Sequence, residues 1–313
     1  MQTRTYGELF KLIRSLAGVG SFSTAELDDV ANLINRRFLQ IFNESPIWPR
    51  YFVSSEKRDV LALTLSGATA STDTTVNQNY KLLGANTTGG SNVYQGATTT
   101  TVIIYNTGSA WRVDTAASVA EQASGTFTVT GGTQQFIEAD TVKKDNITDV
   151  VTFTGRDSAT DSLLVEGKNL VPYAQTGKTT IGSFNRIYRK QAFLNQSALE
   201  YEFFVDVTGA NILNISSTTD NSVFVTYKKQ FTPFDVTSGY DTSTVEVPNE
   251  FFPYLAHATY ADFLRMDGQT DKAFAEEERA NIAMALELEK VDIISNNNTV
   301  NKRFSTYVNR QSR

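Results

Sequence analysis

Apolar residues recur at three- and four-residue intervals near the start of the chain, which predicts helices over 6–17 and 24–44. Ser23 and Glu26 stand three residues apart directly before the second apolar stripe, and this spacing predicts a capping box at its first turn. The two arginines at 36–37 fall among the polar positions and are expected to be solvated.

The same helical spacing returns late in the chain, over 250–267 and 271–291. Asn249 is a suitable N-cap for the first of these segments, and Asp267-Gly268 interrupts the apolar pattern between them. The two segments are therefore predicted to form a helical hairpin with a very short loop.

Alternating and β-branched patterns occupy the middle of the chain and predict strands. Residues 52–65 are expected to be extended. Residues 66–182 are rich in Thr, Ser, Gly and Asn, and their short apolar runs are separated by turn residues, which is typical of a β-sandwich or barrel-like domain. Residues 184–231 contain longer, aromatic-rich strands that would form a second small sheet or continue the strand at 60–65.

The end of the chain differs again in composition. Residues 295–299 read Ser-Asn-Asn-Asn-Thr and are expected to break the last helix, and the segment 293–313 has four positive charges and no acid. Such a terminus is expected to be disordered in an isolated monomer. The predicted class is thus α+β: a body formed by 1–65 and 183–292, with two N-terminal helices, a C-terminal helical hairpin and a sheet region; an inserted β-domain at 66–182; and an extended C-terminal arm at 293–313.

The amino-acid composition excludes several kinds of functional site. The 313 residues include no cysteine and one histidine, which excludes disulfide scaffolds, thiolate nucleophiles and zinc sites built from several histidines of one chain. The net charge of −6 argues against a general nucleic-acid coat. The first residues lack the apolar stretch of a signal peptide and no run of 18 apolar residues occurs, so we expect no membrane association.

The remaining candidates for chemistry are few. His257 is expected to be a packed or interfacial histidine rather than a ligand. Consecutive glutamates at 276–278 point in different directions on a helix and cannot converge on one ion. The aspartates at 140, 145, 149, 157 and 161 lack EF-hand spacing, and nothing places a carboxylate pair for glycoside hydrolysis. We therefore expect no enzyme, no catalytic residue, no metal and no cofactor.

Three stretches resemble bacteriophage head-to-tail adaptors, also called connector or head-completion proteins, including the tubular adaptors of podoviruses. They are the opening from Thr5-Tyr6-Gly7-Glu8-Leu9 to Ile47-Trp48-Pro49, the segment 251–269 that ends in Asp-Gly-Gln, and the Ala/Glu-rich helix with its tail that follows. The β-insert at 66–182 departs from the pattern of compact adaptors, which lack such a domain.

The resemblance implies a structural virion protein in the neck or tail, assembled in the host cytoplasm, that forms a ring, commonly of twelve copies, below the portal. Its partners would be the portal protein, a tail or nozzle protein and its own copies, with genomic DNA passing through without sequence-specific contact. The residues expected in the portal-binding arm are Lys302, Arg303, Phe304, Tyr307, Arg310 and Arg313. Those expected on a helix face toward the channel or a neighbouring subunit are Glu276, Glu277 and Arg279.

Two alternatives stay open. The basic tail could contact DNA through weak, salt-sensitive interactions, or could be a plain disordered tail. The β-insert could instead serve a surface binding module that binds glycan or another virion protein. The aromatic side chains that could stack on sugars are Tyr80, Tyr94, Tyr105 and Trp111, although packing in a core is the simpler interpretation of these residues.

Overall fold

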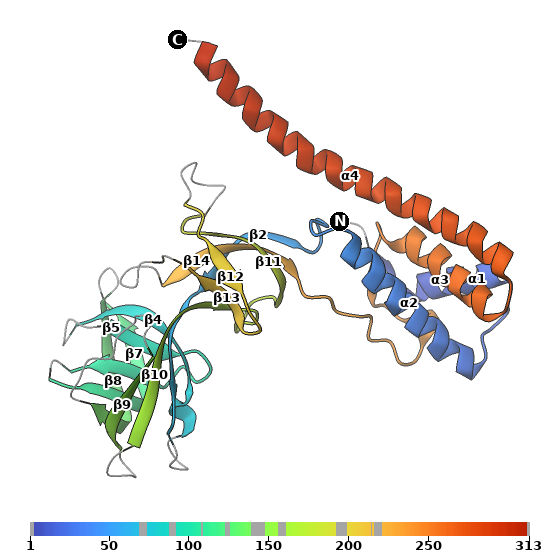
Figure 1. Ribbon diagram of the computed structural model, residues 1–313. Coiled ribbons are helices and arrows are strands. Elements are labelled where there is room, and N and C mark those ends of the chain that lie inside the picture. Colours follow the sequence, from blue (N-terminus) through green and yellow to red (C-terminus); the bar gives the residue numbers. More distant parts are fainter. Residues whose placement is uncertain are drawn as a thin grey trace. The chain divides into compact units, whose positions relative to one another are not determined.

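The computed structural model describes residues 3–68, 74–87, 92–107, 109–122, 126–138, 148–155, 161–191, 199–213, 215 and 221–311, with side chains except at 134–138, 148–155, 161–162 and 293–311. The chain forms two compact units. A helical unit contains Met1–Phe52 and Gln230–Arg313, and a strand-rich unit contains Val53–Lys229 (Figure 1). The predicted mixed α+β class is confirmed.

The helical unit contains four α-helices among the described residues. They are α1 (Tyr6–Ala17), α2 (Thr24–Glu44), α3 (Phe252–Met266) and α4 (Thr270–Gln311). A short strand β1 (Thr3–Thr5) pairs antiparallel with β15 (Glu246–Pro248), which joins the start of the chain to the segment before α3. A 3-10 turn, η2, lies at Tyr240–Thr242.

Local capping fixes where the first two helices begin. Ser23 and Glu26 form the predicted capping box, and Thr5 and Glu8 form a second one at α1. Gly18 ends α1 in the left-handed conformation (φ 70°) that favours glycine. At α3, however, the N-cap is Phe251 without a side-chain cap bond, so the prediction of Asn249 was wrong. The Asn249 carbonyl instead accepts from the Phe252 amide at 3.3 Å.

The core of the helical unit is strongly aromatic. Phe38 stacks on Phe234 with ring centroids 4.4 Å apart, and Phe251 packs edge-on against Trp48 at 4.9 Å. The Trp48 indole N–H donates to the carbonyl of Ile41 at 2.9 Å, so its one polar atom is satisfied inside the core. These contacts join residues from both ends of the chain in one unit.

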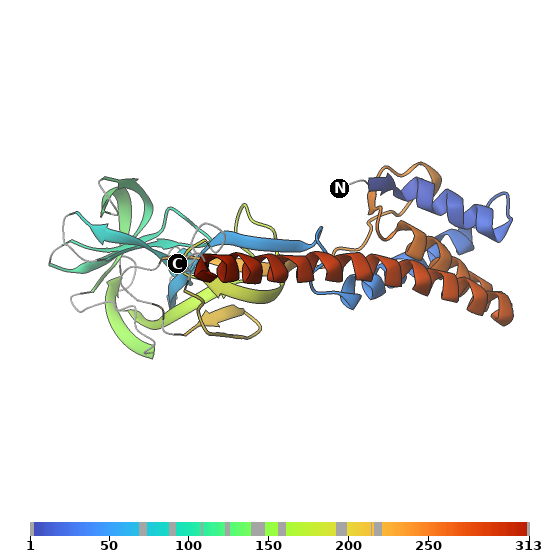
Figure 2. The same ribbon diagram turned by 90° about the horizontal axis from the view of Figure 1, so that it is seen from above.

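The last helix is longer than the sequence predicts. The structure has one helix from Thr270 to Gln311, so the predicted helix end near 291 and the extended arm at 293–313 were wrong over the residues described (Figure 2). The segment 270–311 contains no glycine and no proline. Ser, Asn and Thr cost at most about 0.7 kcal/mol each relative to alanine inside a helix, so the Ser-Asn-Asn-Asn-Thr run does not end it.

The strand-rich unit has two sheets. The strands of the smaller sheet lie in the order β11 (Ile181–Tyr188), β14 (Ser222–Lys229) and β2 (Phe52–Asp59). The larger sheet contains ten strands in the order β12-β13-β10-β3-β4-β5-β6-β7-β8-β9, and β9 also pairs with β10. Their bounds are β3 Leu61–Ser66, β4 Gln78–Asn86, β5 Asn92–Gly96, β6 Ile103–Asn106, β7 Trp111–Glu121, β8 Thr126–Glu138, β9 Thr148–Gly155, β10 Asp161–Pro172, β12 Phe203–Val205 and β13 Gly209–Ile212. A 3-10 turn, η1, lies at Thr74–Val76.

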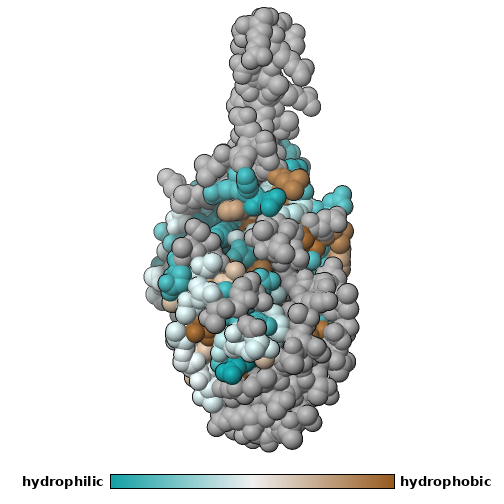
Figure 3. All heavy atoms as spheres, turned by 90° about the vertical axis from the view of Figure 1, so that its left-hand side faces the viewer, coloured by the Kyte–Doolittle hydropathy of each residue, from teal (hydrophilic) through white to brown (hydrophobic). Residues whose placement is uncertain are grey.

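Part of the larger sheet closes on itself. The end of β4 pairs in parallel with the start of β8, through Ala85 with Thr126 and Asn86 with Phe127, which closes β4 to β8 into a five-stranded barrel. On the side of the strand-rich unit seen in Figure 3, the coloured atoms are mainly hydrophilic or weakly polar, with small scattered hydrophobic groups.

The compact units end at other positions than the predicted domains. The boundaries lie near Phe52 and Gln230 rather than at 65/66 and 182/183. The reason is strand pairing: β3 is a neighbour of both β4 and β10, so the strand predicted to belong to the body forms part of the same sheet as the predicted insert. Likewise β14 pairs with β2 and β11 inside the strand-rich unit.

Candidate functional site

A network of charged side chains connects α2, α3 and α4. Arg37 donates to both carboxylate oxygens of Asp262, from Nε and from Nη2, each at 2.6 Å. Arg36 adds a bond to Asp262 at 2.7 Å, and Arg265 adds one at 3.1 Å. Glu277 of α4 accepts from Arg37 at 3.3 Å and forms an ion pair with Arg265. The prediction that Arg36 and Arg37 are both solvated was therefore wrong for Arg37.

The pKa shifts in this network follow from its contacts. Burial of Asp262 would raise the pKa of its carboxyl, but the hydrogen bonds from Arg37 and Arg36 outweigh burial and hold that pKa below its ordinary value. The pKa of Glu277 is also lowered, chiefly by its hydrogen bond from Arg265. Both carboxylates are thus ionised at neutral pH, and the network stabilises the packing of three helices rather than offering a proton donor.

The acidic residues predicted for an outward helix face have partners within the chain. Glu277 contacts the arginines described above, and Glu276 Oε2 lies 2.7 Å from His257 Nδ1 of α3. Arg279 pairs with Glu276 at 2.6 Å, but its side chain is 65% exposed. Of the three residues predicted for a channel or inter-subunit face, the structure therefore brings Glu276 and Glu277 against neighbouring helices and leaves Arg279 largely exposed. His257 is packed against α4, as its sequence context indicates.

The other predicted positions lie where the structure describes the backbone only, or not at all. Residues 302–310 belong to α4, and their side chains lie outside the described residues, as does Arg313. The aspartates at 140, 145 and 157 lie outside the described backbone, and the side chains of Asp149 and Asp161 are not described. Among the residues whose side chains are described, no group of three or more His, Cys, Asp or Glu could hold a metal ion.

The aromatic residues considered for sugar stacking pack in the strand-rich unit. Tyr80, Tyr94 and Trp111 are 0%, 1% and 3% exposed and belong to one hydrophobic cluster. Tyr105 is half-buried and donates to Asp114 at 2.7 Å; burial and this hydrogen bond raise the pKa of its hydroxyl to about 12. Packing in a core is therefore confirmed for the first three, and they offer no stacking surface.

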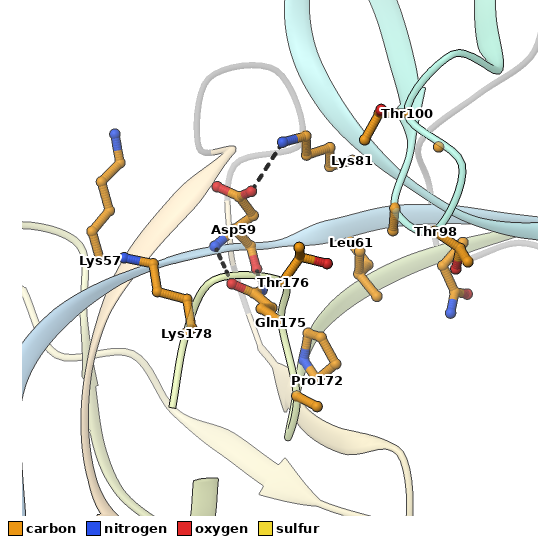
Figure 4. Close-up of a pocket in the computed structure, with 14 residues that line it drawn as sticks. Lys57, Asp59, Leu61, Lys81, Thr98, Thr100, Pro172, Gln175, Thr176 and Lys178 are labelled. Atoms are coloured by element: carbon orange, nitrogen blue, oxygen red, sulfur yellow. Dashed lines mark hydrogen bonds and ion pairs between the residues drawn. The ribbon is translucent and has the colours of Figure 1, made fainter. Parts of the chain in front are cut away.

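Sequence reasoning missed a cavity of about 790 Å³ in the strand-rich unit. Its lining includes three lysines, from β2, β4 and the segment after β10: Lys57, Lys81 and Lys178 (Figure 4). Asp59 lies between them and pairs with Lys81 at 3.1 Å. Gln175 fixes the backbone of Asp59 by accepting from its amide at 3.2 Å and donating to its carbonyl at 2.6 Å.

The lining of this cavity is weakly cationic. Thr98 and Thr100 line the side opposite Lys57 and Lys178, and the lining residues include no histidine and no aromatic side chain (Figure 4). The cavity lacks a nucleophile with a base, and Asp59 and Glu56 partly neutralise Lys81 and Lys178, the latter at 3.9 Å. No sequence spacing could reveal it, because its lysines come from segments about 20 and about 100 residues apart.

Exposed apolar side chains lie on both faces of the hairpin formed by β12 and β13. Val207 at its tip is 95% exposed, and Phe204 on β12 is 54% exposed. Leu199, Val205 and Leu213 are also exposed, as are the acidic residues Glu200, Glu202 and Asp206. β12 stands at the end of the strand order, with β13 as its neighbour. Exposed apolar patches with polar rims are typical of protein-binding surfaces.

Comparisons with protein-family models, with curated proteins and with solved structures found no match to this chain. Among the described residues, no helix is both long enough and apolar enough to cross a membrane.

Proposed function

We propose that this protein is a structural assembly protein of the head-to-tail adaptor class, which forms a ring below the portal of a bacteriophage and joins the capsid to the tail. It would act in the virion neck, with DNA passing through the ring without sequence-specific contact. Support comes from the sequence resemblance, the helical unit built from both ends of the chain, and the absence of any catalytic constellation among the described side chains.

The length of α4 is the observation that carries this proposal. α4 has 42 residues and would span about 63 Å, whereas its antiparallel partner α3 has 15 residues and spans about 22 Å. α3 can therefore cover only the first part of α4, and Figure 1 shows α4 continuing past α3. A helix that continues this far past its hairpin partner is suited to contacts with other molecules.

The residues at the end of α4 suit a groove that is acidic and has apolar pockets. Lys302, Arg303 and Arg310 supply positive charge, and Phe304 and Tyr307 are the aromatic anchors in this role. Each contact of one arm would be weak. A closed ring would engage many identical arms at once, so the ring would bind its portal far more tightly than one copy does.

The test is co-sedimentation with the portal ring of the same source, followed by electron microscopy. Full-length protein is expected to add a ring of density below the portal, and a chain truncated after Asp292 is expected not to bind. The double variant Phe304→Ser, Tyr307→Ser should bind weakly, with Asn297→Ala as a control that should bind normally. Failure of the full-length chain to bind would contradict the adaptor proposal.

A second candidate function is favoured by the apolar hairpin. In this alternative, the strand-rich unit is a binding module whose β12–β13 hairpin contacts another virion protein, such as a tail or nozzle protein. Glycan binding has less support, because three of the four aromatic residues are buried. Loss of tail-protein binding in a Val207→Glu variant, with portal binding retained, would support this second role. Unchanged tail-protein binding would exclude the β12–β13 hairpin as the surface that binds the tail protein.

A further inference from the structure

The outer face of α4 carries exposed apolar residues directly opposite its packed face. Ala273 and Ala280 are fully buried against the rest of the helical unit, whereas Ile282 and Leu286 are each 55% exposed. Ile282 follows Ala273 by nine residues, which is two and a half helical turns, so the two side chains lie on opposite sides of α4. Ala275 continues the same outer stripe about two turns before Ile282 and is also exposed.

Rows of opposite charge flank this stripe. The acidic residues are Asp271, Glu278 and Glu289. Each is followed directly in the sequence by a basic residue: Lys272, Arg279 and Lys290. The spacings of seven and eleven residues bring each set back to one side of the helix, so the acids form one row and the bases another. Ile282 and Leu286 lie between the two rows. All six charged residues are exposed.

The charges are largely available for an external partner. Arg279 and Lys290 make i,i+3 pairs with Glu276 and Glu287, but both basic side chains remain about two-thirds exposed, at 65% and 64%. Exposed ion pairs of this kind contribute little to stability, and their side chains can readily form other pairs. An incoming row of carboxylates could therefore replace them.

We propose that α4 is a self-association surface on which α4 of a second copy packs in parallel, burying Ile282 and Leu286 between the two helices. In a parallel pair the acidic row of one helix meets the basic row of the other. An antiparallel pair brings acid against acid and base against base, which is repulsive. The charge pattern thus identifies both the partner, which is a second copy of this chain, and its direction.

The sequence beyond the packed part of α4 continues the same repeat. Ile293 and Val300 follow Leu286 at intervals of seven residues, in a segment that is helical to Gln311. A seven-residue apolar repeat is typical of a left-handed coiled coil. Self-association of α4 requires no portal, so its outcome and that of the portal experiment are independent.

The first test is sedimentation of the full-length chain over a range of concentrations. Wild type is expected to associate reversibly, and the double variant Ile282→Glu, Leu286→Glu is expected to raise the dissociation constant at least about tenfold. Leu39→Glu is the control, because it places a negative charge at another exposed apolar position of the helical unit, 43% exposed on α2, and it should associate like wild type. Circular dichroism checks that each variant is folded. A wild-type chain that stays monomeric at all concentrations would overturn the proposal.

The second test uses the absence of cysteine from the chain. Ala275→Cys and Leu286→Cys are made as separate single variants and oxidised under mild conditions. These positions are about 16 Å apart along the axis, so an antiparallel pair cannot bring both residues next to their own copies. Disulfide-linked dimers with both variants indicate parallel helices. Dimers with one variant only, or with neither, would overturn the parallel arrangement.

Discussion

Arg37 of α2 donates two hydrogen bonds to Asp262 of α3, both at 2.6 Å, although 225 residues separate them in the chain. Their side chains are 8% and 4% exposed. This geometry holds the N-terminal and C-terminal parts of the helical unit together. A buried ion pair gains little over a well-packed apolar pair, but removal of one partner leaves the other charge buried and unpaired.

Asp262→Ala is therefore expected to lower the free energy of unfolding of the helical unit by about 3–5 kcal/mol. Each unit contains one tryptophan, Trp48 and Trp111, so urea unfolding followed by fluorescence in a Trp111→Phe background reports on the helical unit alone. Arg36→Ala is the control. The Arg36 side chain is 64% exposed, and its loss should cost less than about 1 kcal/mol. Similar values for both variants would contradict a special role of the buried pair.

Gly7 in the first turn of α1 lies against the backbone of the segment around η2. A Cβ atom at Gly7 would be 2.6 Å from the carbonyl oxygen of Asp241, a backbone atom that cannot move freely. Gly7→Ala is expected to lower the free energy of unfolding of the helical unit by about 1–3 kcal/mol, measured through Trp48 as above. Gly20→Ala is the matched control, because no atom lies within 4 Å of its added Cβ, and its effect should stay within about 0.5 kcal/mol. Equal effects would indicate that the close approach at Gly7 is relaxed.

The sequence predicts those features that depend on neighbouring residues. The capping box of Ser23 and Glu26 is a three-residue signal, and both N-terminal helices have the bounds that their apolar spacing predicts. The many short strands between 66 and 182 follow from β-branched runs and turn residues in the same way. None of these predictions requires knowledge of which distant segments meet.

Features that depend on distant segments could not be predicted. Arg36 and Arg37 are adjacent and look alike in the sequence. Only the position of Asp262 on another helix explains why Arg37 is buried and Arg36 is exposed. The end of α4 was missed for a different reason. The Asn-rich run predicts a break, but the propensity cost of such residues in a helix is small when no glycine or proline is present. No local sequence pattern around the three lysines of the cavity predicts that they lie together.

Asp206 organises the turn that presents Val207. Its carboxylate accepts from the Thr208 hydroxyl at 2.6 Å and from the Thr208 amide at 2.7 Å, and these bonds lower the pKa of Asp206 from 3.8 to about 2. Because the folded-state pKa is depressed, the carboxylate stabilises the hairpin above about pH 4, and this contribution is lost as the pH falls toward 2. The amide resonance of Thr208 should titrate with a midpoint of about 2, and the resonance should not titrate there in Asp206→Asn. A midpoint near 3.8 would show that these bonds are absent in solution.

The continuity of α4 through the Asn-rich run can be tested at Asn297. Proline at this position removes a backbone donor and clashes with the preceding turn, so Asn297→Pro is expected to interrupt the helix there. Helical ellipticity at 222 nm should fall by roughly a sixth, the share of the α-helical residues that lie at or beyond position 297. Asn297→Ala, the matched control at the same site, should keep or slightly raise the signal, because alanine has the higher helix propensity. If the proline variant matches wild type, the end of the chain is not helical in solution, and the contacts proposed for α4 beyond Asp292 would have to form from an extended segment that orders only on its partner.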